Sequence, residues 1–249
     1  MSSNNDPGSS AAQRELIGLV REVFGDEVRS IILYGSYLKE TYTPGVSDIN
    51  VLIILDQVTP TGLSEFGRRA GRLLRRHRIT PLILSHDEFV SSSDVFPMEY
   101  LDIVATHKVL HGDDATSDLT ISRTHLRHQV EHQLRGYLLS LRQLAVASGS
   151  GTVSTRGLGR ELQNWYGSLS AILRGVLRLY GIDSIPVTDR ELVEQLNRTV
   201  GLSAGPILEL IASRATRCRN PKELTDSLIE RLGTLVIMVD RMEQSGEVN

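Results

Sequence analysis

The chain has a single cysteine, Cys218, among its 249 residues, so no disulfide can form within it. One unpaired thiol fits a reducing compartment such as the cytoplasm. No apolar run approaches the roughly 20 residues that a membrane-spanning helix needs. The first residues are polar and lack the basic-then-apolar order of a signal peptide. We therefore expect a cytoplasmic protein that does not enter a membrane, with a disordered tail over residues 1–10.

The chain also lacks a strong charge of either sign, because its net charge is only -3. Its hydrophobic content of 40% is typical of a soluble globular protein, and this balance gives no overall attraction to nucleic acid or membranes. One stretch departs from the balance, and we interpret it as a solvated helix face, with a phosphate- or RNA-facing patch as the alternative. It contains Arg68, Arg69, Arg72, Arg75, Arg76 and Arg78, with His77 among them.

Strand and helix patterns alternate over the first half of the chain. Short apolar runs bounded by turn residues predict strands, and apolar residues at helical spacing predict helices. A helical turn is expected to begin at Phe96-Pro97. The expected helices cover residues 11–24 and 61–76, and the expected strands cover residues 28–34, 48–55, 79–84 and 108–110.

Only helical patterns follow residue 120, with long apolar stripes over 124–147 and 158–176. We therefore expect two domains, an α/β domain over residues 11–117 and an all-α helical bundle over residues 118–249, which is an α+β chain overall. An apolar outer stripe on the bundle leaves a homodimer open, because the sequence does not separate such a stripe from internal packing.

The pattern with the most chemical content lies between residues 31 and 55. A predicted strand runs into Gly35-Ser36, where a residue without a side chain allows a sharp turn and close approach of a phosphate. The next strand opens with Asp48 and Asn50. Side chains at positions i and i+2 of a strand share a face, so these two are expected to point the same way.

Residues 31–55 resemble the nucleotidyltransferase (DNA polymerase β-like) superfamily, whose signature is a Gly-Ser turn followed by Asp-x-Asp on the next strand. The helical half resembles the partner domain of aminoglycoside nucleotidyltransferases and of fused nucleotidyltransferase–helical toxin–antitoxin proteins. The resemblance implies a mixed sheet flanked by helices that binds a nucleoside triphosphate with Mg²⁺ or Mn²⁺. It also implies transfer of a nucleoside monophosphate, expected from ATP, to an acceptor hydroxyl on a small molecule, a protein or RNA.

By this resemblance Gly35 and Ser36 hold the phosphates, Asp48 is catalytic, and Asp48 and Asn50 bind the metal. The chain departs from the family at Asn50, where a neutral amide replaces the second acid. At an effective dielectric near 20, a missing unit charge ~4 Å from a cation withdraws roughly 4 kcal/mol per unit of cation charge. The third acid of the family is also missing from the strand over 79–84. A catalytically weakened nucleotide-binding or regulatory module is therefore the alternative function.

Two pairs of acids lie at positions from which they could replace the missing carboxylates. Asp87 and Glu88 follow the third strand, and we interpret them as the first turn of a helix capped by Ser85. Glu99 and Asp102 share one face of the next helical turn, and we interpret them as a surface pair, with a carboxylate facing the cleft as the alternative.

In the helical half, Arg123 and His128 resemble the spaced Arg and His of helical ribonucleases of the HEPN group, and His132 extends the same face as a potential zinc ligand. We favour a solvated helix start for all three. Trp165 and Tyr166 are expected to anchor the core. Glu131 and Glu161 are interpreted as charged helix faces, with a general base as the alternative.

Overall fold

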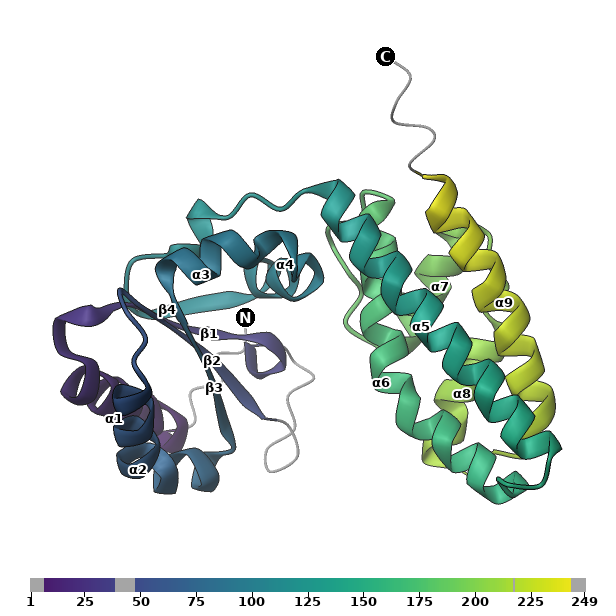
Figure 1. The fold of residues 1–249 in the computed structure, drawn as a ribbon, viewed down its shortest axis with the longest axis horizontal. Coiled ribbons are helices and arrows are strands. Elements are labelled where there is room, and N and C mark those ends of the chain that lie inside the picture. The colour runs from purple at the N-terminus through teal and green to yellow at the C-terminus, as the bar shows by residue number, and fades with distance from the viewer. Residues whose placement is uncertain (1–6, 39–47, 217, 243–249) are drawn as a thin grey trace, which may run out of the picture. The chain divides into compact units, whose positions relative to one another are not determined.

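The computed structural model describes residues 7–38, 48–216 and 218–242. The chain divides into two compact units, Met1–Ile121 and Ser122–Asn249, which we call the N-terminal unit and the helical unit (Figure 1). The division lies just after the 3-10 helix Ala115–Asp118, in which the boundary was expected. Of the tail predicted over residues 1–10, residues 1–6 lie outside the described ranges, and residues 7–10 belong to the first helix.

The N-terminal unit is built on a mixed sheet of four strands in the order β3-β2-β1-β4. Strand β1 pairs antiparallel with both β2 and β4, whereas β2 and β3 run parallel. The predicted mixed sheet is therefore confirmed. Pro81 does not end β3, because this strand lies at the sheet edge and a missing N–H can be tolerated there. The strands are β1 Val28–Tyr34, β2 Ile49–Leu55, β3 Ile79–Ser85 and β4 His107–Gly112.

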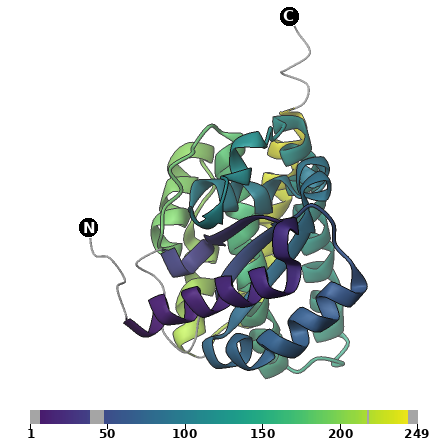
Figure 2. The ribbon, with the colours of Figure 1, turned by 90° about the vertical axis from the view of Figure 1, so that its left-hand side faces the viewer.

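Helices cover both faces of this sheet. Helices α1, Pro7–Phe24, and α2, Pro60–His77, lie together on one face, and α3, His86–Ser91, and α4, Pro97–Ala105, cover the other (Figures 1 and 2). Apart from Asn50, strand β2 is apolar, because its residues from Val51 onward alternate between two cores. Val51, Ile53 and Leu55 pack toward α1 and α2. Leu52 and Ile54 pack toward α3 and α4, with Phe89 and Tyr100.

Short 3-10 helices connect these elements. They are η1 Gly25–Glu27, η2 Gly35–Leu38, η3 Ser92–Asp94 and η4 Ala115–Asp118. The second of them is the Gly-Ser turn, and it follows directly on β1.

The helical unit consists of α-helices, as predicted. Helix α5 packs against α6 and α9, and the shorter α7 and α8 pack against α6. Tyr166 is buried in the core, and the half-buried Trp165 meets Tyr137 edge-on with ring centroids 6.0 Å apart, so both residues anchor the core as expected. The helices are α5 Arg123–Gly149, α6 Thr155–Leu179, α7 Asp189–Val200, α8 Gly205–Ala215 and α9 Pro221–Arg241.

Membrane insertion was not expected from the sequence. Among the helices in the described ranges, none combines the length and apolar character that a membrane span requires.

Two leucines on α5 test its orientation in the bundle. Leu141 is fully buried, whereas Leu139 on the same helix is 56% exposed. We expect Leu141→Ala to lower the free energy of unfolding by about 2–5 kcal/mol through cavity formation. Leu139→Ala should change it little, because the two residue types have similar helix propensities. Urea unfolding followed by fluorescence of Trp165, the single tryptophan, reports on this unit. Equal losses would contradict the assigned face.

Candidate active site

The Gly-Ser turn adopts a backbone conformation that favours glycine. Gly35 has φ +83°, and its N–H donates a 3.2 Å hydrogen bond to the carbonyl of Thr106 at the end of α4. A Cβ at Gly35 would lie 3.2 Å from the Nδ2 atom of Asn50. The turn therefore brings bare backbone directly against the Asn50 amide, between the end of β1 and the start of β2.

The register between β1 and β2 explains why Asn50 lies beside the Gly-Ser turn. Tyr34, the last residue of β1, pairs with Asn50, the second residue of β2. Alternate residues of a strand share a face, so Asn50 points to the same side as Leu52 and Ile54. That side is the one covered by α3 and α4.

A cavity of about 470 Å³ opens at this place, within the size range of small-molecule sites. The Gly-Ser turn, Asn50 and side chains of α4 border it, and Leu82, Phe96 and Tyr100 contribute apolar wall. Its polar lining consists of Gly35, Ser36, Asn50, Ser92, Glu99 and Asp102.

The two carboxylates of this cavity come from α4. Glu99 and Asp102 both line it, Glu99 at an exposed position and Asp102 half-buried. The structure thus supports the alternative of carboxylates facing the cleft over the preferred surface pair. The signal in the sequence is their spacing of three residues, which puts both side chains on one helix face. That face borders a cavity only because α4 packs over the Asn50 side of the sheet.

Asp48 is placed differently from Asn50. It precedes β2, is exposed, and does not line the cavity. Its Oδ1 atom lies 2.7 Å from Nη2 of Arg78, and both side chains are about half exposed. The structure therefore brings Gly35, Ser36 and Asn50 together around one cavity and places Asp48 beside it on the same strand end, in an ion pair.

Arg78 is held close to Asp48 by the backbone. It ends α2 in the left-handed conformation, with φ 52°, and its carbonyl accepts a 2.9 Å hydrogen bond from the N–H of Ile49. An ion pair as exposed as this one contributes little to stability. Asp48 can therefore exchange the guanidinium for another cation at small cost.

The oxygen donors at this position suit one kind of metal ion. Within the part of the chain that the structure describes, no group of three or more His, Cys, Asp or Glu could hold a metal. Mg²⁺, however, keeps several waters and is commonly bound through one or two carboxylates together with substrate phosphates. Asp48 and Asn50 supply one carboxylate and one amide oxygen. They fit a Mg²⁺ that arrives with a triphosphate, and they do not form a cage made of protein alone.

The prediction for Asp87 and Glu88 is confirmed. Ser85 and Glu88 form a capping box at the start of α3, in which the Ser85 N–H donates to Oε2 of Glu88 at 2.8 Å. This backbone hydrogen bond is the main cause that lowers the pKa of Glu88. Neither acid lines the cavity.

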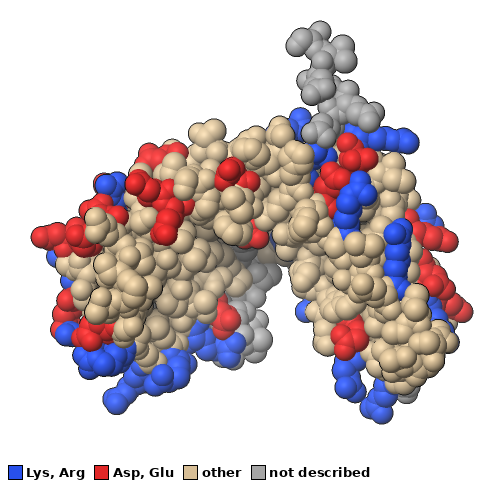
Figure 3. All heavy atoms as spheres, viewed as in Figure 1, with Lys and Arg blue, Asp and Glu red and all other residues tan. Residues whose placement is uncertain are grey.

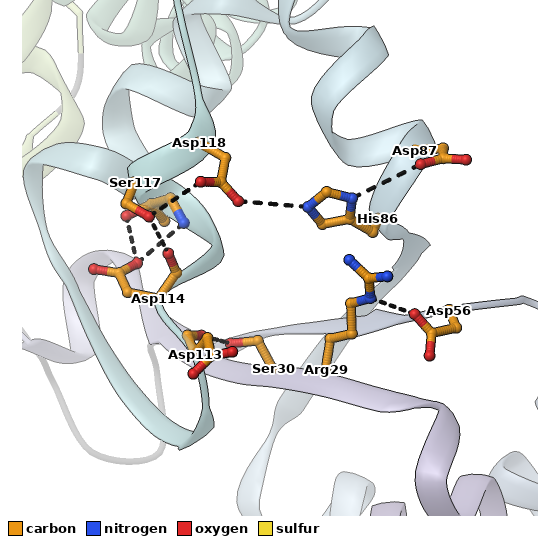
Figure 4. Close-up of polar contacts among 10 residues, drawn as sticks. Arg29, Ser30, Asp56, His86, Asp87, Asp113, Asp114, Ser117 and Asp118 are labelled. Atoms are coloured by element: carbon orange, nitrogen blue, oxygen red, sulfur yellow. Dashed lines mark hydrogen bonds and ion pairs between the residues drawn. The ribbon is translucent and has the colours of Figure 1, made fainter.

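A second polar cluster lies around the end of β4 (Figure 4). The Asp114 side chain accepts hydrogen bonds from the N–H and hydroxyl of Thr116, at 3.0 and 2.6 Å, and caps the 3-10 helix η4. The Thr116 hydroxyl is the main cause that lowers the pKa of Asp114. His86 lies 3.5 Å from Asp118, and the Ser30 hydroxyl donates to the carbonyl of Asp113. These contacts join β1, α3 and η4, so we assign them a structural role.

The arginine-rich stretch of α2 supports the interpretation as a solvated face. Figure 3 shows Lys and Arg side chains gathered over the part of the N-terminal unit where Figure 1 draws α2. Arg68 and Arg69 both hydrogen-bond to Glu65 and lower its pKa to about 2, with Arg68 the larger cause. Arg69 also pairs with Glu22 of α1.

The two members of the ribonuclease-like pair of the helical unit each have a contact with another residue. The Nη2 atom of Arg123 donates a 2.6 Å hydrogen bond to the carbonyl of Leu179 at the end of α6. The His128 ring instead lies 3.1 Å from the guanidinium of Arg127. Both contacts have structural roles, and the described part of the chain places no metal cluster at His132.

Glu131 is an ion-paired residue within the bundle. It lies 2.7 Å from the buried Arg127 and 2.6 Å from Arg135. Burial raises the pKa of Glu131, but hydrogen bonds from Arg135 and Arg127 outweigh it and lower the pKa overall. This arrangement fits a charged helix face, whereas Glu161 is half-buried on α6.

Gly35 provides a direct test of the turn. Gly35→Ala should lower the free energy of unfolding by about 1–2 kcal/mol, because a Cβ is disfavoured at positive φ. Gly18 in α1 is the matched control, since a Cβ there meets nothing within 4 Å. Gly18→Ala should raise the free energy of unfolding by about 0.5–1 kcal/mol. Urea unfolding followed by circular dichroism measures both, and an unchanged Gly35→Ala would contradict the assigned turn.

Comparison with known proteins agrees with this geometry. Residues 14–99 match the family model of the nucleotidyltransferase domain, and no curated protein matches the chain by sequence. The crystal structure of spectinomycin adenyltransferase AAD(9) from Enterococcus faecialis, with ATP and spectinomycin, superposes with a TM-score of 0.53 at 12% identity, over 90% of this chain and 99% of that one. At this identity the likeness concerns the fold. The chain therefore carries a nucleotidyltransferase domain in residues 14–99, joined to a helical C-terminal part.

Proposed function

We propose that the protein transfers a nucleoside monophosphate from a nucleoside triphosphate, expected to be ATP, to a hydroxyl group of an acceptor. The observation that carries the proposal is the shared cavity, in which the Gly-Ser turn, the Asn50 amide and two carboxylates meet. The family match over residues 14–99 supports it. So does the fold shared with an adenyltransferase whose structure holds ATP.

Gly35 and Ser36 are the proposed phosphate-binding residues. The bare Cα of Gly35 leaves room for a phosphate to approach the backbone, and Ser36 adds a hydroxyl that can donate a hydrogen bond. Both residues border the cavity, so the phosphates would lie beside Asn50.

Asp48 and Asn50 are the residues that would hold a Mg²⁺ or Mn²⁺ ion together with the triphosphate. The chemistry that such an ion supplies is neutralisation of phosphate charge and a lower cost of attack at the α-phosphorus. A metal ion at Asp48 would compete with Arg78, whose Nη2 atom lies 2.7 Å from one oxygen of the carboxylate. We propose that this exchange accompanies nucleotide binding.

The carboxylates of α4 are the proposed proton acceptors. In the reaction the acceptor oxygen forms a bond to the α-phosphorus, the bond to the pyrophosphate oxygen breaks, and the hydroxyl proton leaves. Glu99 and Asp102 line the cavity from α4, so either can take that proton from a hydroxyl bound within hydrogen-bond reach. The acceptor itself, a small molecule, a protein or RNA, stays open.

One observation favours a second function, nucleotide binding without turnover. Asn50 provides no charge, and the carboxylate of Asp48 is engaged by Arg78. A pocket with this charge balance can hold a nucleotide as a sensor while lacking the two anionic ligands that rapid transfer needs.

Substitutions of Asp48 and Asn50 distinguish nucleotide transfer from nucleotide binding without turnover. With labelled ATP and Mg²⁺ or Mn²⁺, we expect Asp48→Ala to reduce pyrophosphate release at least tenfold, which is about 1.4 kcal/mol of barrier. Asn50→Asp should increase release, because it adds a negative charge beside the cation. Asp56→Ala, which removes the acid paired with Arg29 after the other end of β2, is the control and should have little effect. Tight ATP binding without turnover, in both the unaltered protein and Asn50→Asp, would favour the sensor.

The Arg78 ion pair makes a separate prediction about metal dependence. Arg78→Asn removes the competing cation and keeps a residue that tolerates the left-handed conformation. The Mg²⁺ concentration that half-saturates ATP binding should fall about twofold to fivefold, as expected for an exposed ion pair. Arg76→Asn, two residues earlier in the last turn of α2, is the matched loss of charge and should leave the value unchanged. A titration in which both variants behave alike would remove Asp48 from the metal site.

A further inference from the structure

The helical unit contains a second cavity, of about 850 Å³, lined by the first turns of α6 and the segment that leads into α9. Three arginines, Arg156, Arg160 and Arg219, border it, and we call it the arginine pocket. Thr155 and Thr216 add hydroxyl groups to its lining. Nothing in the proposed transfer reaction uses these residues.

Packing between helices fixes the walls of the arginine pocket. Gly159 is buried, and a Cβ at this position would lie 3.3 Å from the Cβ of Cys218, so α6 packs directly on the segment before α9. The side-chain amide of Gln163 donates hydrogen bonds to the carbonyls of Ser213 and, at 3.0 Å, Thr216. The segment that carries Arg219 is therefore held against α6 by the fold itself.

Several other arginines in the same unit are paired with acids. Arg127, Arg135, Arg190 and Arg214 each form an ion pair with an Asp or Glu. Within the described ranges, no ion pair engages the arginines of the pocket, and no Asp or Glu lines it.

One acid outside the lining, Glu209, interacts electrostatically with Cys218 of the pocket. Burial raises the pKa of the Cys218 thiol, and the charge of Glu209 raises it further. Cys218 lines the pocket, whereas Glu209 does not. Three arginines and no acid line the pocket, so its lining carries an excess of positive charge that an anion would neutralise.

We propose that the arginine pocket binds a small ligand with two or more linked phosphate groups. Guanidinium groups present a planar fork of donors that matches phosphate oxygens, and such charge-assisted hydrogen bonds are the strong ones. The three arginines line one hollow, which suits a compact oligophosphate. A nucleic-acid backbone would instead be met by a basic stripe that follows its length.

Hydrogen–deuterium exchange on the full chain with sodium pyrophosphate tests this proposal by location. We expect slower amide exchange in peptides that cover residues 155–163 and 218–222. The double variant Arg160→Gln/Arg219→Gln should lose this protection. Arg190→Gln/Arg198→Gln removes the same charge from α7, where neither side chain lines the pocket, and should retain it. Unchanged circular dichroism and Trp165 fluorescence would show that the variants fold.

Three results would overturn the proposal. Protection confined to residues 34–38 and 99–103 would place pyrophosphate in the N-terminal cavity only. Equal protection in the double variant and its control would show that the arginines do not bind it. Protection of the pocket by a single-stranded RNA oligomer, with none by pyrophosphate, would indicate a nucleic-acid site. The transfer reaction is tested separately by the Asp48 and Asn50 variants, so failure of this proposal and failure of the proposed function can be distinguished.

Discussion

The antiparallel register of β1 and β2 is the constraint on which the candidate active site depends. It pairs Tyr34 with Asn50 and so sets the Gly-Ser turn beside the amide. A slip of one residue would turn Asn50 toward the core that Val51 and Ile53 form with α1 and α2. An amide buried there without partners costs free energy, because it loses its hydrogen bonds to water. The same apolar packing that stabilises the sheet therefore also positions the site.

Features of the site that depend on neighbouring residues in the chain could be predicted from the sequence. The strand before Gly35, the turn itself and the apolar run after Asn50 all follow from local patterns of apolar residues and glycine. The mixed sheet came instead from the family resemblance, because no local pattern states that β2 and β3 are parallel. The helix cap at Ser85 could likewise be predicted from the sequence, since it involves residues three positions apart.

The parts that could not be predicted depend on tertiary packing. Glu99 and Asp102 looked like surface residues because their role requires α4 to lie over the Asn50 side of the sheet. The Asp48–Arg78 ion pair requires the parallel pairing of β2 with β3, which brings Ile49 against the end of α2. Both contacts join residues that are far apart in the chain, and the residue types alone do not identify the partners. The three arginines of the pocket were missed for the same reason, since their segments are far apart in the chain.

The two cavities proposed to bind phosphate differ in the charge of their linings. Two acids line the N-terminal cavity and a third, Asp48, lies beside it, so phosphate would meet negative charge there unless a cation came with it. Asn50 lowers this repulsion because its amide is neutral. A carboxylate at the same position would repel the phosphate more strongly in the absence of metal. The arginine pocket carries positive charge in its own side chains, so the proposed binding there would need no metal ion. Phosphate binding in the first cavity should therefore depend on a divalent cation, whereas binding in the second should depend on ionic strength alone.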